Sequence, residues 1–154
     1  MERLRDKEAE LINDLVMINT DRIESFAKAV EGLNTDKDAD AIAILEKLGQ
    51  QSQQFKSQLA PFADQQHSGA ARGSSQSQGA LYQLWTRQYR EIDREGRKGI
   101  LIACNEKEEV FEKVYGNVLD SVSQIDEKIV QMIKSQLEVQ RQAHQVLKEI
   151  ALRQ

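Results

Sequence analysis

Four long stretches with helical apolar spacing, joined by a short, a long and a short connection, constrain the fold of this chain most strongly. Apolar residues recur at three- and four-residue steps over about 6–31, 36–60, 98–119 and 124–152. A short link makes its two helices an antiparallel hairpin, whereas a long middle stretch can cross the length of a bundle. The sequence therefore predicts an all-α four-helix bundle with hairpins 1–2 and 3–4 and a long crossover between helices two and three.

The crossover divides into two parts of different composition. Residues 64–79 are polar and glycine-rich, which is typical of a mobile linker. Residues 80–92 place Leu81, Leu84 and Trp85 at helical spacing, so we expect a short helix lying across the bundle. Pro61 should end or kink the second helix, because proline lacks the N–H and its ring clashes with the preceding turn.

Length and charge narrow the class of protein. A chain of 154 residues predicts a single domain over 1–154. The net charge of -4 arises from mixed signs, so no basic surface indicates nucleic acid, and no apolar run is long enough to span a bilayer. Cys104 is the only cysteine, which excludes an internal disulfide and a multi-thiolate zinc site. We expect a soluble cytoplasmic protein.

Each long helix carries polar residues on or beside its apolar stripe near mid-length. A buried polar group without a partner is costly, so these positions either face one another in a hydrogen-bonded layer or reach water at the edge. A layer of this kind can form an interior site or can only fix the helix register. The residues are Asn19, Ser52, Asn105 or Glu106, and Gln136 or Gln140.

Motifs along nearly the whole chain resemble a bacterial family of ferritin-like four-helix-bundle proteins, a domain of unknown function. The resemblance implies the ferritin-like fold and carries no settled activity. The motifs are Ile12-Asn13-Asp14-Leu15, Ile18-Asn19, Asp21-Arg22-Ile23-Glu24, Gln50-Gln51 with Phe55 and Leu59, Gly79-Ala80-Leu81 with Trp85, Ile100-Leu101, Cys104 with Glu108, Glu109 and Tyr115, and His144.

Ferritin-like proteins that bind two metal ions use a glutamate from each of two helices and a Glu-x-x-His pair from each of the other two. Here helix two offers Gln51-x-x-Gln54 and helix four offers Arg141-x-x-His144, so two carboxylates and one histidine are missing. Arginine keeps its charge at ordinary pH. We therefore expect a polar network in place of the metal centre, with Arg141 and His144 facing acids from helices one and three. Its candidate members are Asn19, Gln51, Gln54, Asn105, Gln140 and Arg141.

Two hypotheses for function remain open. The first is a non-enzymatic structural or interaction protein with a degenerate metal site and no cofactor, linked to stress responses by analogy with its ferritin-like relatives. The second is an iron- or other metal-binding oxidative protein with an atypical site, whose candidate ligands are Asp21, Glu24, Glu109 and His144.

Other features have plain structural interpretations beside these functional ones. His144 at a core edge donates a hydrogen bond to a carbonyl or carboxylate, unless it binds metal or transfers protons. The run Glu106–Glu109 is typical of a charged helix surface. Trp85 either closes one end of the bundle or anchors a partner or a second copy of the chain in a homo-oligomer.

Overall fold

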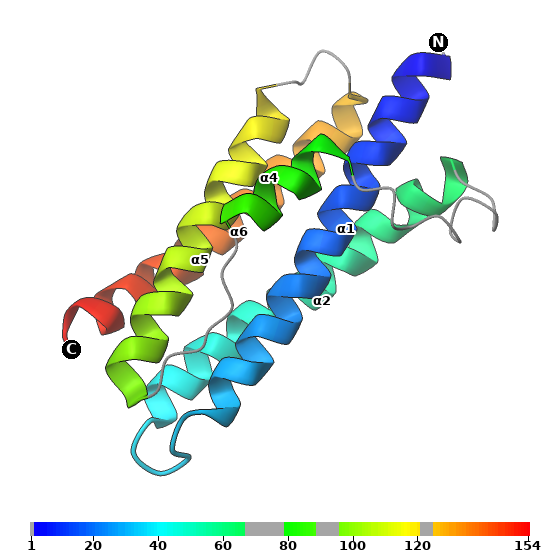
Figure 1. Ribbon diagram of the computed structural model, residues 1–154. Helices are drawn as coiled ribbons and strands as arrows, with labels where there is room; N and C mark the ends of the chain where they lie inside the picture. The colour runs from blue at the N-terminus through cyan, green and yellow to red at the C-terminus, as the bar shows by residue number, and fades with distance from the viewer. Residues whose placement is uncertain (1, 67–78, 89–95, 121–124) are drawn as a thin grey trace.

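The computed structural model describes residues 2–66, 79–88, 96–120 and 125–154. This part of the chain is helical, which confirms the all-α expectation. Four long helices lie side by side and a short one crosses them (Figure 1). The helices are α1 (Glu2–Glu31), α2 (Ala39–Gln66), α4 (Ala80–Gln88), α5 (Gly96–Leu119) and α6 (Glu127–Leu152).

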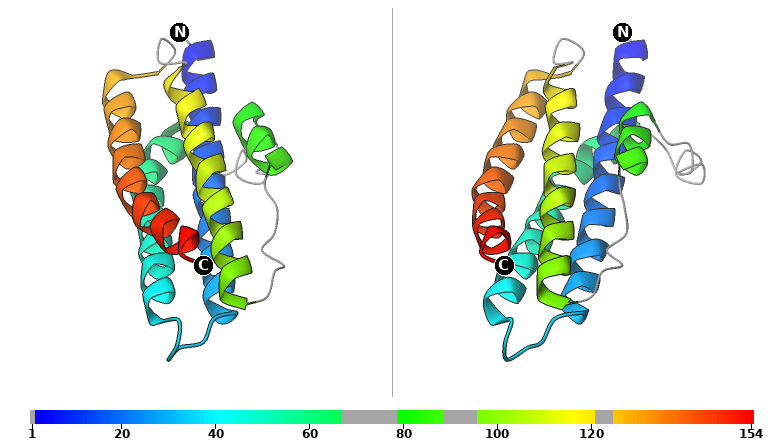
Figure 2. Two further views of the ribbon diagram at one scale, coloured as in Figure 1. Left: turned by 90° about the vertical axis from the view of Figure 1, so that its left-hand side faces the viewer. Right: turned by 60° about the vertical axis from the view of Figure 1, so that its left-hand side comes forward.

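The directions of the four long helices are those expected when a long connection joins the second helix to the third. Helices α1 and α2 form one antiparallel hairpin, α5 and α6 form the other, and α2 and α5 run in the same direction (Figure 2). Packing also joins α2 with α6, while α4 contacts both α1 and α5. The short helix therefore covers the seam between α1 and α5.

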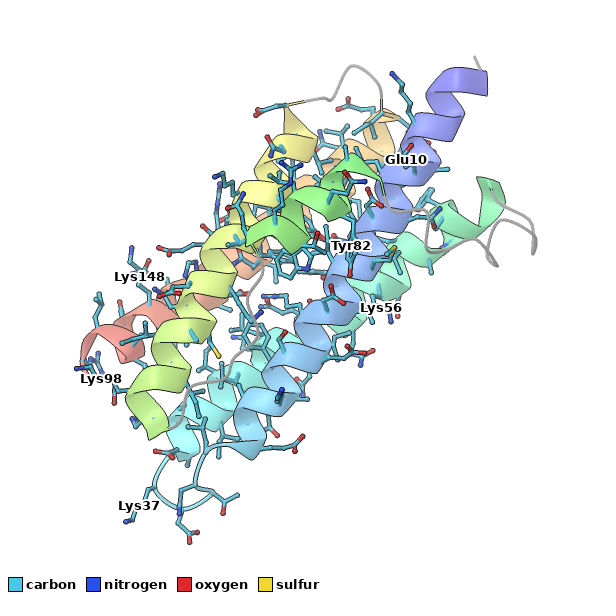
Figure 3. All side chains as sticks on the ribbon, in the orientation of Figure 1. Glu10, Lys37, Lys56, Tyr82, Lys98 and Lys148 are labelled. Carbon is cyan, nitrogen blue, oxygen red and sulfur yellow. The ribbon has the colours of Figure 1, made fainter. Side chains whose placement is uncertain are left out.

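The interior contains two apolar clusters that occupy different lengths of the bundle. Leu15, Ile18 and Phe111 belong to one cluster, which also includes Trp85 of α4. Phe26 belongs to the other cluster, with the first halves of α2 and α5 and the last turns of α6. Apolar positions three and four residues apart form each buried stripe, whereas Lys37, Lys98 and Lys148 point away from the bundle (Figure 3).

Polar contacts fasten the ends of the helices. The Asp126 side chain accepts a hydrogen bond from the backbone N–H of Lys128 at 2.8 Å, which caps the start of α6. Arg97, at the start of α5, pairs with Asp40 at 2.8 and 2.9 Å and with Asp38 at 3.3 Å. The first turn of α5 is thereby tied to the start of α2.

Helix α2 continues through Pro61 to Gln66, so the expected end of the second helix near residue 60 is wrong. Pro61 is exposed, and the turn that follows it packs Phe62 and Ala63 against the core. The backbone carbonyl that loses its intrahelical bond can then be met by water, while the burial of Phe62 and Ala63 favours the helix.

The other expected boundaries agree within a few residues. Helix α4 ends at Gln88, and the rest of the expected helix 80–92 lies outside the described residues, as does most of the expected linker 64–79. None of the described helices is both long and apolar enough to cross a membrane.

Candidate functional site

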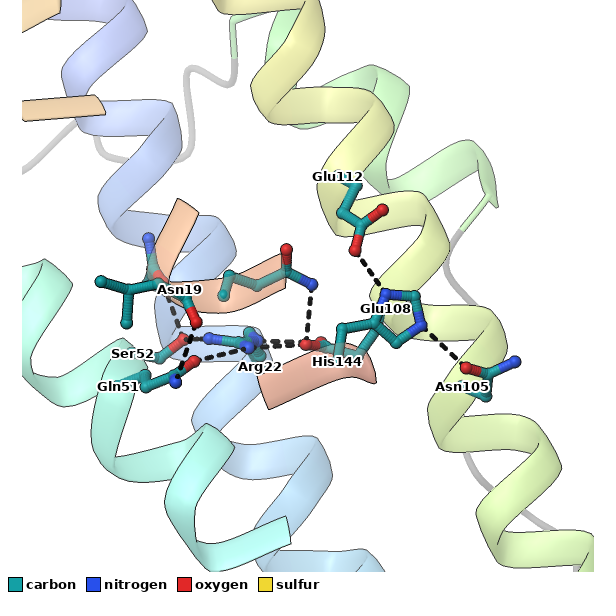
Figure 4. Close-up of polar contacts among 10 residues, drawn as sticks. Asn19, Arg22, Gln51, Ser52, Asn105, Glu108, Glu112 and His144 are labelled. Atoms are coloured by element: carbon teal, nitrogen blue, oxygen red, sulfur yellow. Dashed lines mark hydrogen bonds and ion pairs between the residues drawn. The ribbon is translucent and has the colours of Figure 1, made fainter. Parts of the chain in front are cut away.

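The centre of the bundle holds a buried ion pair between α1 and α5. The side chains of Arg22 on α1 and Glu108 on α5 are 1% and 0% exposed. Arg22 Nε donates to Glu108 Oε2 at 2.9 Å and Nη2 donates to Oε1 at 2.6 Å, so the contact is bidentate (Figure 4). Parallel charge-assisted bonds of this kind are strong and directional. The pair therefore fixes how α1 and α5 face each other.

Helix α2 supplies acceptors for the other side of the guanidinium. Arg22 Nη1 donates to Ser52 Oγ at 2.8 Å, and Nη2 donates to Gln51 Oε1 at 3.4 Å. The Phe111 ring centroid lies 4.4 Å from Arg22 Cζ, which adds a cation–π contact. The cation is thus held at its edges by oxygen atoms and at its face by an aromatic ring.

Helix α6 completes the environment of the carboxylate. Gln140, which is fully buried, donates from Nε2 to Glu108 Oε1 at 3.0 Å. Both oxygens of Glu108 already accept bonds from Arg22. Arg22 therefore balances the charge of the Glu108 carboxylate, and Arg22 and Gln140 together donate three hydrogen bonds to it.

A chain of hydrogen bonds extends from this pair toward the other half of the bundle. Ser52 Oγ donates to Asn19 Oδ1 at 2.7 Å, Asn19 Nδ2 donates to the Tyr115 hydroxyl at 3.1 Å, and that hydroxyl donates to Gln136 Oε1 at 2.7 Å. Burial raises the pKa of Tyr115, and the smaller opposing effects of Asn19 and the Arg22 charge do not cancel it. The phenol therefore stays protonated and acts as a donor.

We call this set the Arg22 network, and it contains Asn19, Arg22, Gln51, Ser52, Glu108, Tyr115, Gln136 and Gln140. It joins all four long helices and lies between the two apolar clusters. Arginine does not release its proton at ordinary pH. The chemistry of the network therefore favours a fixed helix register over proton transfer.

A second polar group, the His144 cluster, lies at the edge where α5 meets α6. His144 Nδ1 contacts the Glu112 carboxylate and Nε2 lies 2.8 Å from Asn105 Oδ1 (Figure 4). Burial raises the pKa of Glu112, but the hydrogen bond and charge of His144, with Gln140 and the Arg141 charge, outweigh it and leave that pKa below its ordinary value. His144 therefore links the Glu112 carboxylate and the Asn105 amide, both on α5, to α6.

Cys104 is buried among the apolar residues, as the sequence predicts. Burial and the nearby Glu108 charge raise the pKa of its thiol to about 12. The thiol therefore stays protonated near neutral pH and is a poor nucleophile.

The structure does not bring the four candidate metal ligands together. Asp21 accepts hydrogen bonds from two side chains of α4, Glu24 and Glu109 are exposed, and His144 belongs to its own cluster. Across the described ranges, no group of three or more His, Cys, Asp or Glu side chains could hold a metal ion. The centre itself offers one carboxylate and a permanent cation. These residues do not fit a two-metal centre.

The polar residues singled out from the sequence fall into three places. Asn19, Gln51 and Gln140 lie in the Arg22 network, and Asn105 lies in the His144 cluster. Gln54 and Arg141 are exposed. The expectation that Arg141 and His144 face acids from helices one and three holds only for α5, where both act on Glu112. The cation at the centre is Arg22, because Arg141 is exposed on α6.

Sequence reasoning missed the central pair, although a signal was present. Arg22 lies four residues after Ile18 and four before Phe26, so it occupies the apolar stripe of α1. Glu108 lies four residues after Cys104 and three before Phe111, so it occupies the stripe of α5. Opposite charges at stripe positions on two helices indicate a buried ion pair.

The interpretation of residues 106–109 as a charged surface is half wrong. Glu106 and Glu109 are exposed, but Lys107 and Glu108 are buried. A helix turns about 100° per residue, so four consecutive charges cannot all face water on a packed helix.

Trp85 lies over the side of the bundle, so the alternative that it closes one end is wrong. Its side chain is 1% exposed and meets the Phe111 ring edge-to-face, with centroids 6.5 Å apart. In this conformation Trp85 belongs to the core and presents no anchor to a second copy.

Comparisons of the chain with models of protein families, with curated proteins and with solved structures found no match. The family resemblance therefore stays a prediction of the sequence motifs.

Proposed function

We propose that this chain is a ferritin-like bundle that acts as a non-enzymatic structural or interaction protein, with an internal ion pair in place of a metal centre. The observation that carries the proposal is the buried bidentate contact between Arg22 and Glu108, bonded further by Ser52 of α2 and Gln140 of α6. In two-metal bundles, carboxylates from facing helices project inward and surround metal cations in the bundle core. Here a guanidinium on the chain itself supplies that positive charge.

The electrostatics of the centre support the same conclusion. A divalent ion placed beside Glu108 would meet the Arg22 charge within a few ångströms, and the interior screens such repulsion weakly. Removing Arg22 from the carboxylate would leave a buried charge unpaired, which is strongly unfavourable. The resident ion pair therefore excludes metal from the centre.

The organisation of the polar groups also favours a structural role. Every member of the Arg22 network bonds to another helix of the bundle, and Glu108 has both oxygens occupied. A substrate would have to break these bonds before it could reach a reactive group. Self-association and the identity of a protein partner remain parts of the proposal, to be tested by sedimentation.

Metal content separates this proposal from a metal-binding oxidative function. The protein is purified without chelators, analysed for metals, and titrated with ferrous iron under anaerobic conditions. We expect no stoichiometric metal in the wild type or in the control Glu149→Gln, which changes an exposed carboxylate outside the candidate ligands. Stoichiometric iron in the wild type that disappears in Glu108→Gln or in His144→Ala would overturn the proposal.

A further inference from the structure

Helix α4 is attached to the bundle differently from the four long helices. It has nine residues and packs against only α1 and α5 among the contacts described above. An isolated helix of this length is not stable in water. Its helical structure therefore depends on remaining docked over the seam between α1 and α5 (Figure 1).

The first anchor of α4 is the Asp14 carboxylate on α1. Asp14 Oδ1 accepts the backbone N–H of Gly79 at 3.0 Å, and Oδ2 accepts the N–H of Tyr82 at 3.2 Å. Gly79 directly precedes α4 and Tyr82 lies in its first turn, where backbone N–H groups have no intrahelical acceptors. The start of α4 is thus capped by a side chain from another helix.

The second anchor lies seven residues further along α1, two helical turns away. Asp21 Oδ2 accepts the Tyr82 hydroxyl at 2.7 Å and the Trp85 indole N–H at 3.1 Å. Tyr82 lies beside α1 where α4 crosses it (Figure 3). Both anchors are carboxylates on one face of α1. Trp85 adds an apolar contact of α4 with Phe111 on α5.

We propose that α4 is a detachable strap, which leaves the seam as one unit while the four long helices stay folded. The bonds of the Arg22 network join α1, α2, α5 and α6, so none of them is lost when α4 leaves. Water can solvate the freed carboxylates of Asp14 and Asp21. Detachment exposes Trp85 and the part of the seam beneath it.

The docked state also carries a cost that favours detachment. Burial raises the pKa of Asp14, and the nearby Glu10 charge adds to this, while the backbone hydrogen bonds of α4 oppose it. Docking therefore dehydrates a charged carboxylate beside another negative charge. Detachment relieves that cost, so the strap is held by a smaller net free energy than its contacts imply.

Gly79 offers a way to weaken the first anchor alone. A Cβ atom at this position would lie 2.3 Å from Asp14 Oδ2 and 2.4 Å from Glu10 Oε1. Gly79→Ala must therefore push the Asp14 carboxylate away from the N–H groups that it caps. The matched control is Gly116→Ala on α5, where an added Cβ meets nothing within 4 Å.

Trp85 is the only tryptophan, so its fluorescence reports on α4 in the full chain. We would follow acrylamide quenching of Trp85 and far-ultraviolet circular dichroism in parallel through a urea titration of the wild type and both variants. Trp85 should become accessible at lower urea than the loss of helical signal. Gly79→Ala should raise the detached population about tenfold or more, because a bond to a charged group contributes roughly 1.4 kcal/mol or more.

The control Gly116→Ala should leave the urea dependence of Trp85 accessibility unchanged, while the loss of helical signal moves to higher urea because Ala is more stable than Gly inside a helix. Coincident transitions in the wild type, with both moved equally by Gly79→Ala, would overturn the proposal and make α4 an integral part of the core. If Gly79→Ala fails to fold, Asp21→Ala tests the second anchor in the same assay, and the wild-type comparison already decides the point. The strap can detach whether or not the protein binds metal or a partner, so failure of the proposed function leaves this test unaffected.

Discussion

Removing one member of the central ion pair should destabilise the protein severely. In Glu108→Gln the shape of the side chain is kept, but the Arg22 guanidinium, 1% exposed, loses its counter-charge. Breaking a buried pair from one side costs about 3–5 kcal/mol, because a charge remains in a poorly solvating interior. For a chain of this length the loss corresponds to a fall in Tm of roughly 6–20 °C.

The double variant shows whether the two residues act as a unit. Arg22→Met with Glu108→Leu removes both charges together, so no buried charge is left unpaired. Its loss should be smaller than the summed losses of Arg22→Met alone and Glu108→Leu alone by about 2 kcal/mol or more. It should not reach zero, because Ser52, Gln51 and Gln140 each lose one hydrogen-bond partner, and a buried polar group left unsatisfied costs about 1–3 kcal/mol.

Urea unfolding followed by circular dichroism measures these free energies, with Glu109→Gln as the exposed control. That control should change stability by about 0.5 kcal/mol or less. The reasoning is refuted if each single variant loses less than about 1 kcal/mol, or if the double variant loses the full sum of the single losses. Either result would mean that the pair contributes little to the coupling of α1 with α5.

Three further predictions concern the periphery of the bundle. The pKa of Glu112 is lowered below 4.5, so the stability that this carboxylate contributes is present in full above about pH 4.5 and is lost as the pH falls through the lowered pKa. The urea midpoint of the wild type should therefore fall as the pH is lowered from about 7 to about 3. In His144→Gln the midpoint should depend less on pH. Arg97→Ala should lower the free energy of unfolding by at most about 1 kcal/mol, and by less in 1 M salt, because Asp40 is largely exposed. In this variant, carboxyl NMR should show the pKa of Asp40 rising from about 2 toward 3.8. Phe111→Ala should lower the free energy of unfolding by the roughly 3–5 kcal/mol typical of a buried aromatic residue. Trp85→Ala should lower it by less, because detachment of α4 limits the loss. Equal urea midpoints for the two variants would contradict this.

The helices were predictable because their signal is local. Apolar residues at three- and four-residue spacing mark each long helix, and the short, long, short order of the connections already implies a crossover. The one error of extent, at Pro61, has a tertiary cause. Local preference ends the helix there, but burial of Phe62 and Ala63 carries it on to Gln66.

The candidate site was predictable only in kind. Polar residues at mid-length indicate a buried polar layer, and Asn19, Gln51 and Gln140 do lie in it. The sequence favoured Arg141 as its cation, whereas the structure uses Arg22. Both arginines lie near apolar residues on their helices. Which of them is buried depends on the direction in which its side chain points from the helix axis, and the packing of the bundle sets that direction.

The sequence by itself determined the all-helical class, the approximate helix bounds and the presence of polar groups within apolar stripes. The tertiary structure decided which of those groups meet: it pairs Arg22 with Glu108, separates Asp21 from His144, and places Trp85 over the seam. The physical reason is the range of the forces involved. Helix periodicity is set by neighbours three and four residues away, whereas an ion pair between residues 86 positions apart depends on the rotation and register of two helices that only the packing of the whole bundle fixes.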